Sequence, residues 1–157
     1  MTLRIDRADL DGPDAAALIG ALNAELTSLY PEPGANHFGL LPADVVPGRG
    51  AFLIAYQNDT AVGCGAVRLI DPATAELKRM FVRPAARGSG VGRLLVAGLE
   101  EEAARVGATR VVLETGIRQR AAIALYAHCG YAPIPLYGEY HASPGTSVCL
   151  GKTLGPA

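Results

Sequence analysis

The chain has 157 residues, of which 50% are hydrophobic and 18% are charged, and its formal net charge is −1. This length and balance are typical of one globular domain with a real core, so a single domain over residues 1–157 is expected. A net charge near zero gives no basis for binding nucleic acid or an anionic membrane. No apolar run approaches the ~20 residues of a membrane span, and the N-terminus lacks a signal-peptide core, so a cytoplasmic location is expected.

Three cysteines, Cys64, Cys129 and Cys149, stand far apart in apolar surroundings. Their odd number and the lack of ligand spacing favour reduced thiols over disulfides. The three histidines are equally dispersed, so no metal site is expected.

The first part of the chain is expected to form a strand, a helix and a long loop. Alternating apolar and polar residues predict a half-buried strand over residues 2–7. Leucines at helical spacing predict a helix over residues 14–29, with Asp11 as its N-cap. The proline- and glycine-rich residues 30–50 predict a loop with one short helix at 42–46, and loops of this length are often functional.

Three antiparallel strands are expected next, joined by short turns, over residues 51–56, 61–70 and 74–82. Gly63 and Gly65 lie inside the middle strand, where glycine weakens the strand and marks close packing against a neighbouring element.

A glycine-rich turn over residues 87–92 leads from the third strand into a helical pattern. Glycines let the backbone bend tightly and direct successive N–H groups toward one point, and a helix N-terminus adds further unpaired N–H groups. The turn therefore predicts a phosphate site. A P-loop is excluded because no Lys-Ser or Lys-Thr pair follows, and the dinucleotide fingerprint is excluded because Arg93 replaces its third glycine.

After the turn, a helix is expected to run to about residue 106 and to end at Gly107. The apolar run at 109–114 predicts a buried strand, and the helical crossover makes it parallel to the strand that ends at residue 82. A further helix and two strands are expected at 118–129, 132–136 and 146–152. The fold class is therefore α/β (α+β), with a mixed, mostly antiparallel sheet, a central parallel pair and helices on both faces.

Two separated motifs carry a family resemblance. The turn fits the pattern R-x-x-G-x-G, with Arg87, Gly90 and Gly92, and resembles the pyrophosphate-binding motif of the GNAT superfamily of acetyl-CoA-dependent N-acetyltransferases. The stretch GIRQRAAIALYAHCGYAPI resembles the family's C-terminal motif N-x-x-A-x-x-L-Y-x-x-x-G-[FY]. Its matching residues are Ala122, Leu125, Tyr126, Gly130 and Tyr131. Gln119 stands where the family commonly has Asn.

The resemblance implies the GNAT acyl-CoA N-acyltransferase fold over essentially the whole chain, with the parallel pair splayed to admit acetyl-CoA as cosubstrate. An extended pantetheine arm would pair with the freed strand edge, and the Met80 N–H would act as oxyanion donor unless a bulge shifts the register. The implied cofactor-binding residues are Met80, Phe81, Val82, Arg87, Gly88, Ser89, Gly90, Val91, Gly92, Arg93, Gln119 and Tyr126. The implied reaction is direct attack of an amine on the thioester in a ternary complex.

The resemblance also implies two catalytic residues. Glu76, eleven residues before Arg87, stands where several GNAT enzymes carry their general base, and it could draw the amine proton through water. Tyr126 matches the family's general acid, whose hydroxyl lies near the sulfur. Glu76 could equally be a structural or substrate-binding carboxylate, and Tyr126 a core residue. His37 and His141 are alternative bases.

Two loops, residues 30–50 and 137–145, are expected to wall the acceptor entrance, because they carry most aromatic and histidine residues outside the core elements. The candidate substrate-binding residues are Tyr30, His37, Phe38, Tyr140 and His141. Neither loop has the dense acidic run that would favour a polyamine or basic tail, so a small primary amine is expected. The alternatives are N-terminal or lysine acetylation of a protein or peptide, and a non-catalytic acyl-CoA-binding regulatory module. Formation of a homodimer is left open.

Overall fold

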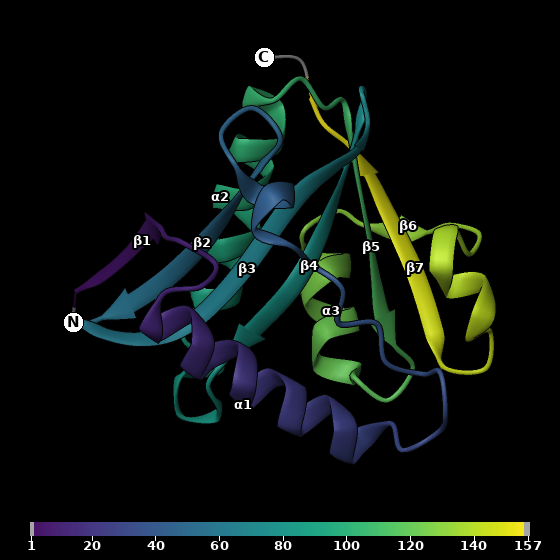
Figure 1. The fold of residues 1–157 in the computed structure, drawn as a ribbon, viewed down its shortest axis with the longest axis horizontal. Helices are drawn as coiled ribbons and strands as arrows, with labels where there is room; N and C mark the ends of the chain where they lie inside the picture. Colours follow the sequence, from purple (N-terminus) through teal and green to yellow (C-terminus); the bar gives the residue numbers. More distant parts are fainter. Residues whose placement is uncertain (1, 156–157) are drawn as a thin grey trace.

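The structure, a computed structural model, describes residues 2–155. Seven strands form one sheet in the order β1-β2-β3-β4-β5-β7-β6 (Figure 1). They are β1 (Leu3–Arg7), β2 (Gly50–Gln57), β3 (Thr60–Asp71), β4 (Thr74–Val82), β5 (Arg110–Gly116), β6 (Ala132–Pro133) and β7 (Ser147–Thr153). Strands β4 and β5 pair in parallel, and every other pairing of the described strands is antiparallel.

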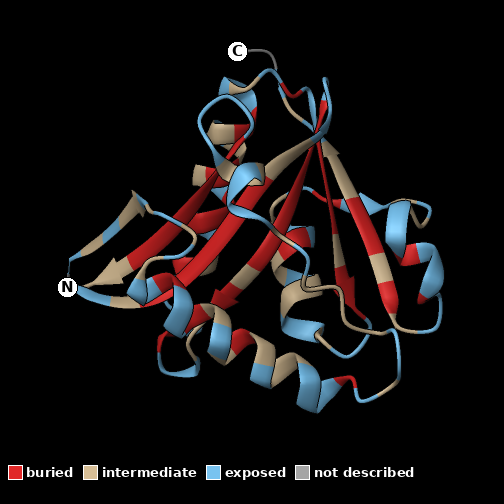
Figure 2. Cartoon of the chain, viewed as in Figure 1, coloured by how far each residue is buried: buried red, intermediate tan, exposed pale blue. Residues whose placement is uncertain are grey.

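Helices cover both faces of the sheet, as predicted. They are α1 (Pro13–Leu29), α2 (Val91–Arg105) and α3 (Arg120–His128), with short 3-10 helices η1 (Pro42–Val45), η2 (Pro84–Ala86) and η3 (Gly138–Ala142). Leu18 and Leu22 of α1 pack with Phe52 and Ile54 in one core cluster. A second cluster joins α2 and α3 to the opposite face. The central strands are buried along most of their length (Figure 2).

Two local predictions need correction. Helix α1 has Gly12 as its N-cap with no side-chain cap bond, so the prediction that Asp11 caps it is wrong. Pro13 begins the helix instead, a position where its missing N–H costs nothing. The strand predicted over 132–136 pairs at Ala132 and Pro133, followed by one bond from the Ile134 N–H to the Cys149 carbonyl. Pro135 then offers no N–H to continue the ladder.

The glycines inside β3 do mark close packing. A Cβ atom at Gly63 would lie 3.2 Å from side-chain atoms of Val91 and Leu95 in α2, and one at Gly65 would lie 2.8 Å from Leu99. Helix α2 therefore lies directly against this strand.

The parallel pair opens partway along its length. Its last paired residues are Leu77 and Leu113, although β4 continues to Val82 and β5 to Gly116. On its other edge β4 has a bulge, because Cys64 faces Phe81 but Ala66 faces Lys78. Two residues of β4, Arg79 and Met80, thus stand opposite one residue of β3. Arg79 has a left-handed φ of 60°, which is rare for a residue with a large side chain. The bulge therefore lies where the parallel pair opens. Residues with rare backbone angles, such as Arg79, cluster at functional sites.

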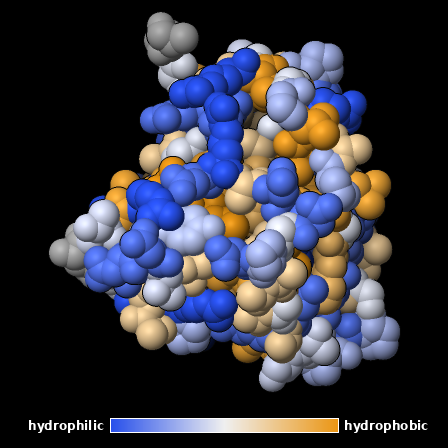
Figure 3. All heavy atoms as spheres, turned by 60° about the vertical axis from the view of Figure 1, so that its left-hand side comes forward, coloured by the Kyte–Doolittle hydropathy of each residue, from blue (hydrophilic) through white to orange (hydrophobic). Residues whose placement is uncertain are grey.

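Side chains on the molecular surface are mixed in character. On the face shown in Figure 3, hydrophilic and hydrophobic residues alternate over short distances. The large exposed hydrophobic residues come from separate segments and are Leu29, Leu41, Val46, Ile70, Leu94 and Ile117. Within residues 2–155, none of the helices combines the length and the apolar character needed to cross a bilayer.

Candidate active site

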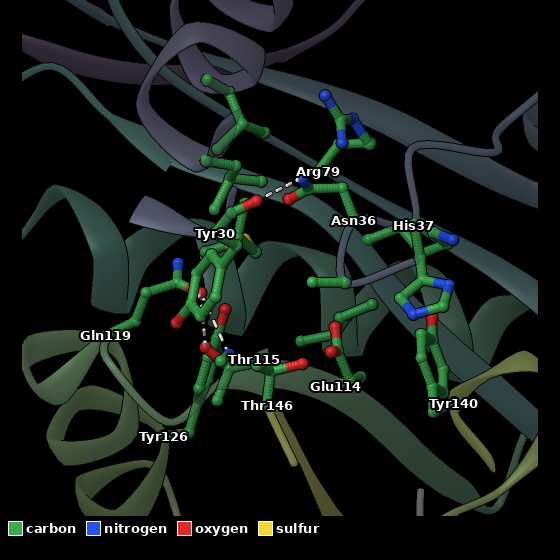
Figure 4. A pocket seen from close by; sticks show the side chains of 17 residues that line it. Tyr30, Asn36, His37, Arg79, Glu114, Thr115, Gln119, Tyr126, Tyr140 and Thr146 are labelled. Carbon is green, nitrogen blue, oxygen red and sulfur yellow. Dashed lines mark hydrogen bonds between the residues drawn. The ribbon is translucent and has the colours of Figure 1, made fainter. Parts of the chain in front are cut away.

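A pocket lies where β4 and β5 part (Figure 4). The structure brings six of the predicted site residues into its lining, namely Tyr30, His37, Met80, Gln119, Tyr126 and Tyr140. In Figure 4, Gln119 and Tyr126 lie on one side, His37 and Tyr140 on the other, and Glu114 between them. The pocket thus combines the open end of the parallel pair with the loops predicted to wall an entrance.

The glycine-rich turn follows β4 and ends at the N-terminus of α2. Gly88 and Gly90 have φ angles of 82° and 90°, and Gly90 is the N-cap of α2. A Cβ atom at either position would meet no other atom within 4 Å, so the turn borders open space. The first turn of α2 has no acidic residue. Free N–H groups and the positive end of the helix dipole therefore make this turn suited to a phosphate.

Several predicted cofactor residues have their side chains occupied elsewhere. Arg87 donates to Glu25 and to the carbonyl of Val82, both at 2.8 Å, so it fastens the turn to α1 and β4. The side chains of Val91 and Phe81 are buried in the two cores. A Cβ atom at Gly92 would lie 2.9 Å from Leu125 of α3. Val91, Phe81 and Gly92 can therefore offer a ligand only their backbone, and the Arg87 guanidinium is already bonded to Glu25 and Val82.

Ser89 and Arg93 are exposed, and the Ser89 hydroxyl donates to the carbonyl of Ala86. Gln119 precedes α3, and its side-chain oxygen accepts from the Gly116 N–H at 3.0 Å. The Tyr30 hydroxyl accepts from the Arg118 N–H at 3.0 Å. Gln119 and Tyr30 therefore hold the end of β5 against α1.

Tyr126 is buried on α3 and packs edge-to-face against Tyr131, with ring centroids 5.9 Å apart. Burial raises the pKa of its hydroxyl. The group therefore stays protonated at neutral pH and can donate a hydrogen bond into the pocket.

Glu76 is not brought into the pocket. It lies on β4 with 2% of its surface exposed, and it is absent from the lining. One carboxylate oxygen accepts from Arg68 at 3.0 Å, and the other accepts from the hydroxyls of Tyr137 and Tyr140 at 2.6 and 2.9 Å. Arg68 also pairs with Asp44 at 3.3 Å. Both oxygens of Glu76 are therefore committed to structural partners.

Phe38 and His141 also lie outside the lining. The Phe38 ring lies 4.9 Å from the guanidinium of Arg79, so it supports the bulge, and His141 is exposed on η3. His37 is the histidine in the pocket. Its Nδ1 lies 2.9 Å from Glu139, and its Nε2 lies 2.8 Å from the Ser143 hydroxyl.

Three charged residues of the pocket, Lys78, Arg79 and Glu114, were not predicted. Lys78 is 6% exposed, and burial lowers its pKa. Glu114 is the first residue of β5 beyond its pairing with β4, and burial raises its pKa. The sequence did carry a signal for these residues. Their charges interrupt two largely apolar strands near the carboxyl ends, and ligands bind at the carboxyl ends of parallel strands.

A chain of hydrogen bonds leads from Glu114 to the surface. Ser147 donates to Glu114 at 2.6 Å, and the hydroxyls of Ser147 and Ser143 are 2.7 Å apart. The Ser143 hydroxyl is hydrogen-bonded to Nε2 of His37, and Nδ1 of His37 is hydrogen-bonded to the half-exposed Glu139. Every bond in this chain has normal hydrogen-bond length.

The cysteines and the other groups that commonly bind metal ions form neither disulfides nor a metal site in the part of the chain that the structure describes. Cys64, Cys129 and Cys149 are free thiols. Over residues 2–155, His, Cys, Asp and Glu side chains form no group of three that could hold a metal ion.

Comparisons with known proteins agree with this geometry. The Acetyltransferase (GNAT) family matches residues 17–131. An IAA acetyltransferase of Azospirillum brasilense is 40% identical over 128 residues, which cover 81% of this chain and 82% of that protein. A solved structure described as an acyl-CoA N-acyltransferase from Klebsiella pneumoniae has a TM-score of 0.82 and 32% identity, covering 98% of this chain and 99% of that one.

A GNAT family acetyltransferase from Elizabethkingia anophelis, solved with acetyl-CoA bound, shares the fold at a TM-score of 0.69 and 17% identity, with 97% and 98% coverage. The family match spans the opened parallel pair, the glycine-rich turn and Tyr126. The resemblance predicted from the two motifs is confirmed, and the chain belongs to the GNAT family of acetyltransferases.

Proposed function

We propose that this acetyltransferase transfers the acetyl group of acetyl-CoA to a primary amine of a small molecule, by direct attack while both substrates are bound. The pocket at the open end of β4 and β5 carries this proposal. Holding two reactants together there can supply on the order of 7–11 kcal/mol of the barrier reduction.

The chain's own residues fit acetyl-CoA. The N–H groups of the turn at 88–92 would hold the pyrophosphate, and the edge of β4 beyond Leu77 would pair with an extended pantetheine arm. Despite the bulge at Arg79, Met80 lines the pocket and Phe81 does not, so we assign the Met80 N–H as the oxyanion donor. Bound acetyl-CoA supplies the activated acyl group.

Glu114 is proposed as the base that takes the proton of the amine. It lines the pocket, whereas Glu76 does not, and a raised pKa makes a carboxylate a stronger base near neutral pH. Glu76 as a base acting through water is the competing assignment. In our assignment Glu76 acts by positioning Tyr140 and Arg68.

We infer that the proton leaves Glu114 through the serine chain. When Glu114 is protonated, it can donate to Ser147, Ser147 to Ser143, and Ser143 to Nε2 of His37. A shift of one proton along each bond leaves Glu114 ionised again and His37 as an imidazolium beside the carboxylate of Glu139.

Replacing His37 with alanine is therefore expected to lower kcat about tenfold at neutral pH, because the chain loses its outlet, as for other proton-transfer groups. Added imidazole should restore the rate, which a purely structural loss would not allow. His141→Ala is the matched control, since His141 is exposed and outside the pocket lining. Equal losses in the two variants, or no rescue by imidazole, would contradict the relay.

Tyr126 is proposed to donate a hydrogen bond to the departing sulfur. Its raised pKa favours donation of a hydrogen bond over complete loss of the proton. Tyr126→Phe is expected to lower kcat by roughly 10- to 100-fold while the dissociation constant for acetyl-CoA changes little, since only the transition state loses an interaction. Single-turnover kinetics and calorimetry separate the two quantities. A weakened acetyl-CoA complex with unchanged kcat would contradict this role.

The acceptor side of the pocket supports a small molecule. Tyr140, Tyr30 and Lys78 are buried there, so the space is walled by side chains that are already packed. The similar Azospirillum protein is named an IAA acetyltransferase, which refers to a small-molecule acceptor.

A screen of amino acids, polyamines, aminoglycosides and basic peptides, with release of the CoA thiol as readout, tests this function. Turnover of small amines supports it. Turnover of peptides alone would favour protein acetylation, and acetyl-CoA binding without any turnover would favour a regulatory module.

A further inference from the structure

Lys78 is a buried cation whose Nζ lacks a hydrogen-bond partner and lies 5.9 Å from the centre of the Tyr140 ring. It lies on β4 next to the bulge, and 6% of its surface is exposed. Over residues 2–155, the Lys78 Nζ is the single buried side-chain nitrogen or oxygen atom that has no hydrogen-bond partner. A buried ammonium normally has its donors satisfied, because water is no longer there to do so.

The protein's own carboxylates are committed elsewhere. The nearest ion-pair oxygen, on Glu139, lies 3.9 Å away, and the other oxygen of that residue meets His37. Glu76 is occupied by Arg68 and two tyrosines, as described above. The adjacent cation Arg79 donates to Asn23 and lies over Phe38. Lys78 therefore has three donors free for a ligand in the pocket that it lines.

Lys78 and Glu114 face one another across the opening. The last parallel pair is Leu77 with Leu113, so Lys78 and Glu114 are the next residue of each strand. Both line the pocket, yet they form no ion pair within 4.0 Å among the ion pairs of residues 2–155. A buried cation and a buried carboxyl group are thus held apart in one pocket.

We propose that Lys78 binds a carboxylate of the acceptor while Glu114 receives its amine, so the acceptor class is small amino acids that carry both groups. This rests on the proposed function of the same pocket. The ammonium donates charge-assisted hydrogen bonds to the carboxylate. An amine without a carboxylate would bring a second cation into the pocket and leave the Lys78 ammonium without an acceptor, so polyamines and lysine side chains are disfavoured.

The experiment uses matched pairs of amino acids and their primary amides, which keep the amine and the side chain but lose the carboxylate charge. Binding of each to the CoA complex is measured by calorimetry in the wild-type protein, in Lys78→Met and in Lys152→Met. The chain has two lysines, and Lys152 is the matched control because its Nζ already donates to Glu100 at 3.0 Å and to the Cys129 carbonyl at 2.8 Å.

The wild-type protein is expected to bind one or more acids at least tenfold more tightly than the matching amides. Lys78→Met should bring that ratio close to one, and Lys152→Met should keep it. Because the Nζ of Lys78 is buried without a hydrogen bond and its ion pair with Glu139 spans 3.9 Å, Lys78→Met is also expected to melt no lower than wild type, whereas Lys152→Met should melt lower.

Three outcomes would overturn the inference: amides that bind as tightly as acids in the wild-type protein, equal loss of acid and amide binding in Lys78→Met, or no acid that binds. The first and third need no variant to fold. Thioester turnover is followed separately. Selective acid binding without acetyl transfer would keep this inference and remove the proposed function, and transfer to amines regardless of a carboxylate would do the reverse.

Discussion

Glu114→Gln is expected to lower kcat/KM by about 100-fold or more at pH 8, in the range measured for loss of a general base. Because the base must be ionised, the wild-type rate should rise with pH through the raised pKa of Glu114. Glutamine cannot ionise, so this rise should vanish in the variant. A pH profile of kcat/KM, measured with a subsaturating amine and saturating acetyl-CoA, gives both effects.

Glu76→Gln is the matched comparison, because it makes the same chemical change on the neighbouring strand. Glu76 accepts from Arg68, Tyr137 and Tyr140, so its loss should cost about 2 kcal/mol of stability, as for hydrogen bonds to a charged group. The pH-dependent rise should persist in this variant. The reverse result, with the rise lost only in Glu76→Gln, would restore Glu76 as the base.

The stability of the protein gives a second measure of Glu114. Burial holds its pKa above the ordinary 4.5, so the folded state binds this proton more tightly than the unfolded chain does. Below the ordinary value both states are protonated and burial costs little. As pH rises through the folded pKa the buried charge destabilises the fold. Glu114→Gln should therefore raise Tm above pH 7 and leave it unchanged near pH 4. A gain that does not vary with pH would contradict this.

Gly90→Val is expected to weaken CoA binding on the order of 100-fold, which corresponds to losing one or two charge-assisted hydrogen bonds. Gly90 has a φ of 90°, which a β-branched residue adopts only with strain, so the turn should change shape. No protein atom lies within 4 Å of the new Cβ, so the side chain would project into the space proposed for the pyrophosphate. Calorimetry with CoA measures the loss.

Gly107→Val separates strain from binding. Gly107 follows the other end of α2 with a φ of 94° and equally open surroundings. Both Gly107→Val and Gly90→Val should melt lower than wild type, but Gly107→Val should bind CoA normally. Unchanged CoA affinity in folded Gly90→Val protein would remove the turn from the proposed function.

Local patterns predicted the antiparallel strands β2, β3 and β4, the helices and the glycine-rich turn, because each depends on residues that are close in sequence. The crossover from β4 through α2 to β5 fixed the parallel pair in the same way. The place of β7 between β5 and β6 was not predicted. Two mispredictions have prolines as their cause. Pro13 begins α1 and makes Gly12, not Asp11, the N-cap, and the prolines of 132–136 lack the N–H groups that a longer strand beside β7 would need.

The pocket was less predictable because it depends on register. Lys78 and Glu114 are 36 residues apart, and only the pairing of Leu77 with Leu113 places them opposite each other. Glu76 has the sequence position of a base, but its neighbours Arg68, Tyr137 and Tyr140 come from two other segments, β3 and the loop around η3. Those contacts set its surroundings, and no spacing within β4 encodes them.

The bonds of Glu76 have a consequence for how an acceptor enters. Through Arg68 its carboxylate is joined to Asp44 in η1, and through Tyr140 to η3, so the two loops beside the pocket share one buried anchor. Outward movement of η3 would take Tyr140 from that carboxylate, and outward movement of η1 would break the pair between Asp44 and Arg68, so either movement would be costly. The entrance is thus an opening of fixed size rather than a closing lid. Selection among amines should then follow molecular width, with association rates that change little between the acceptors that fit.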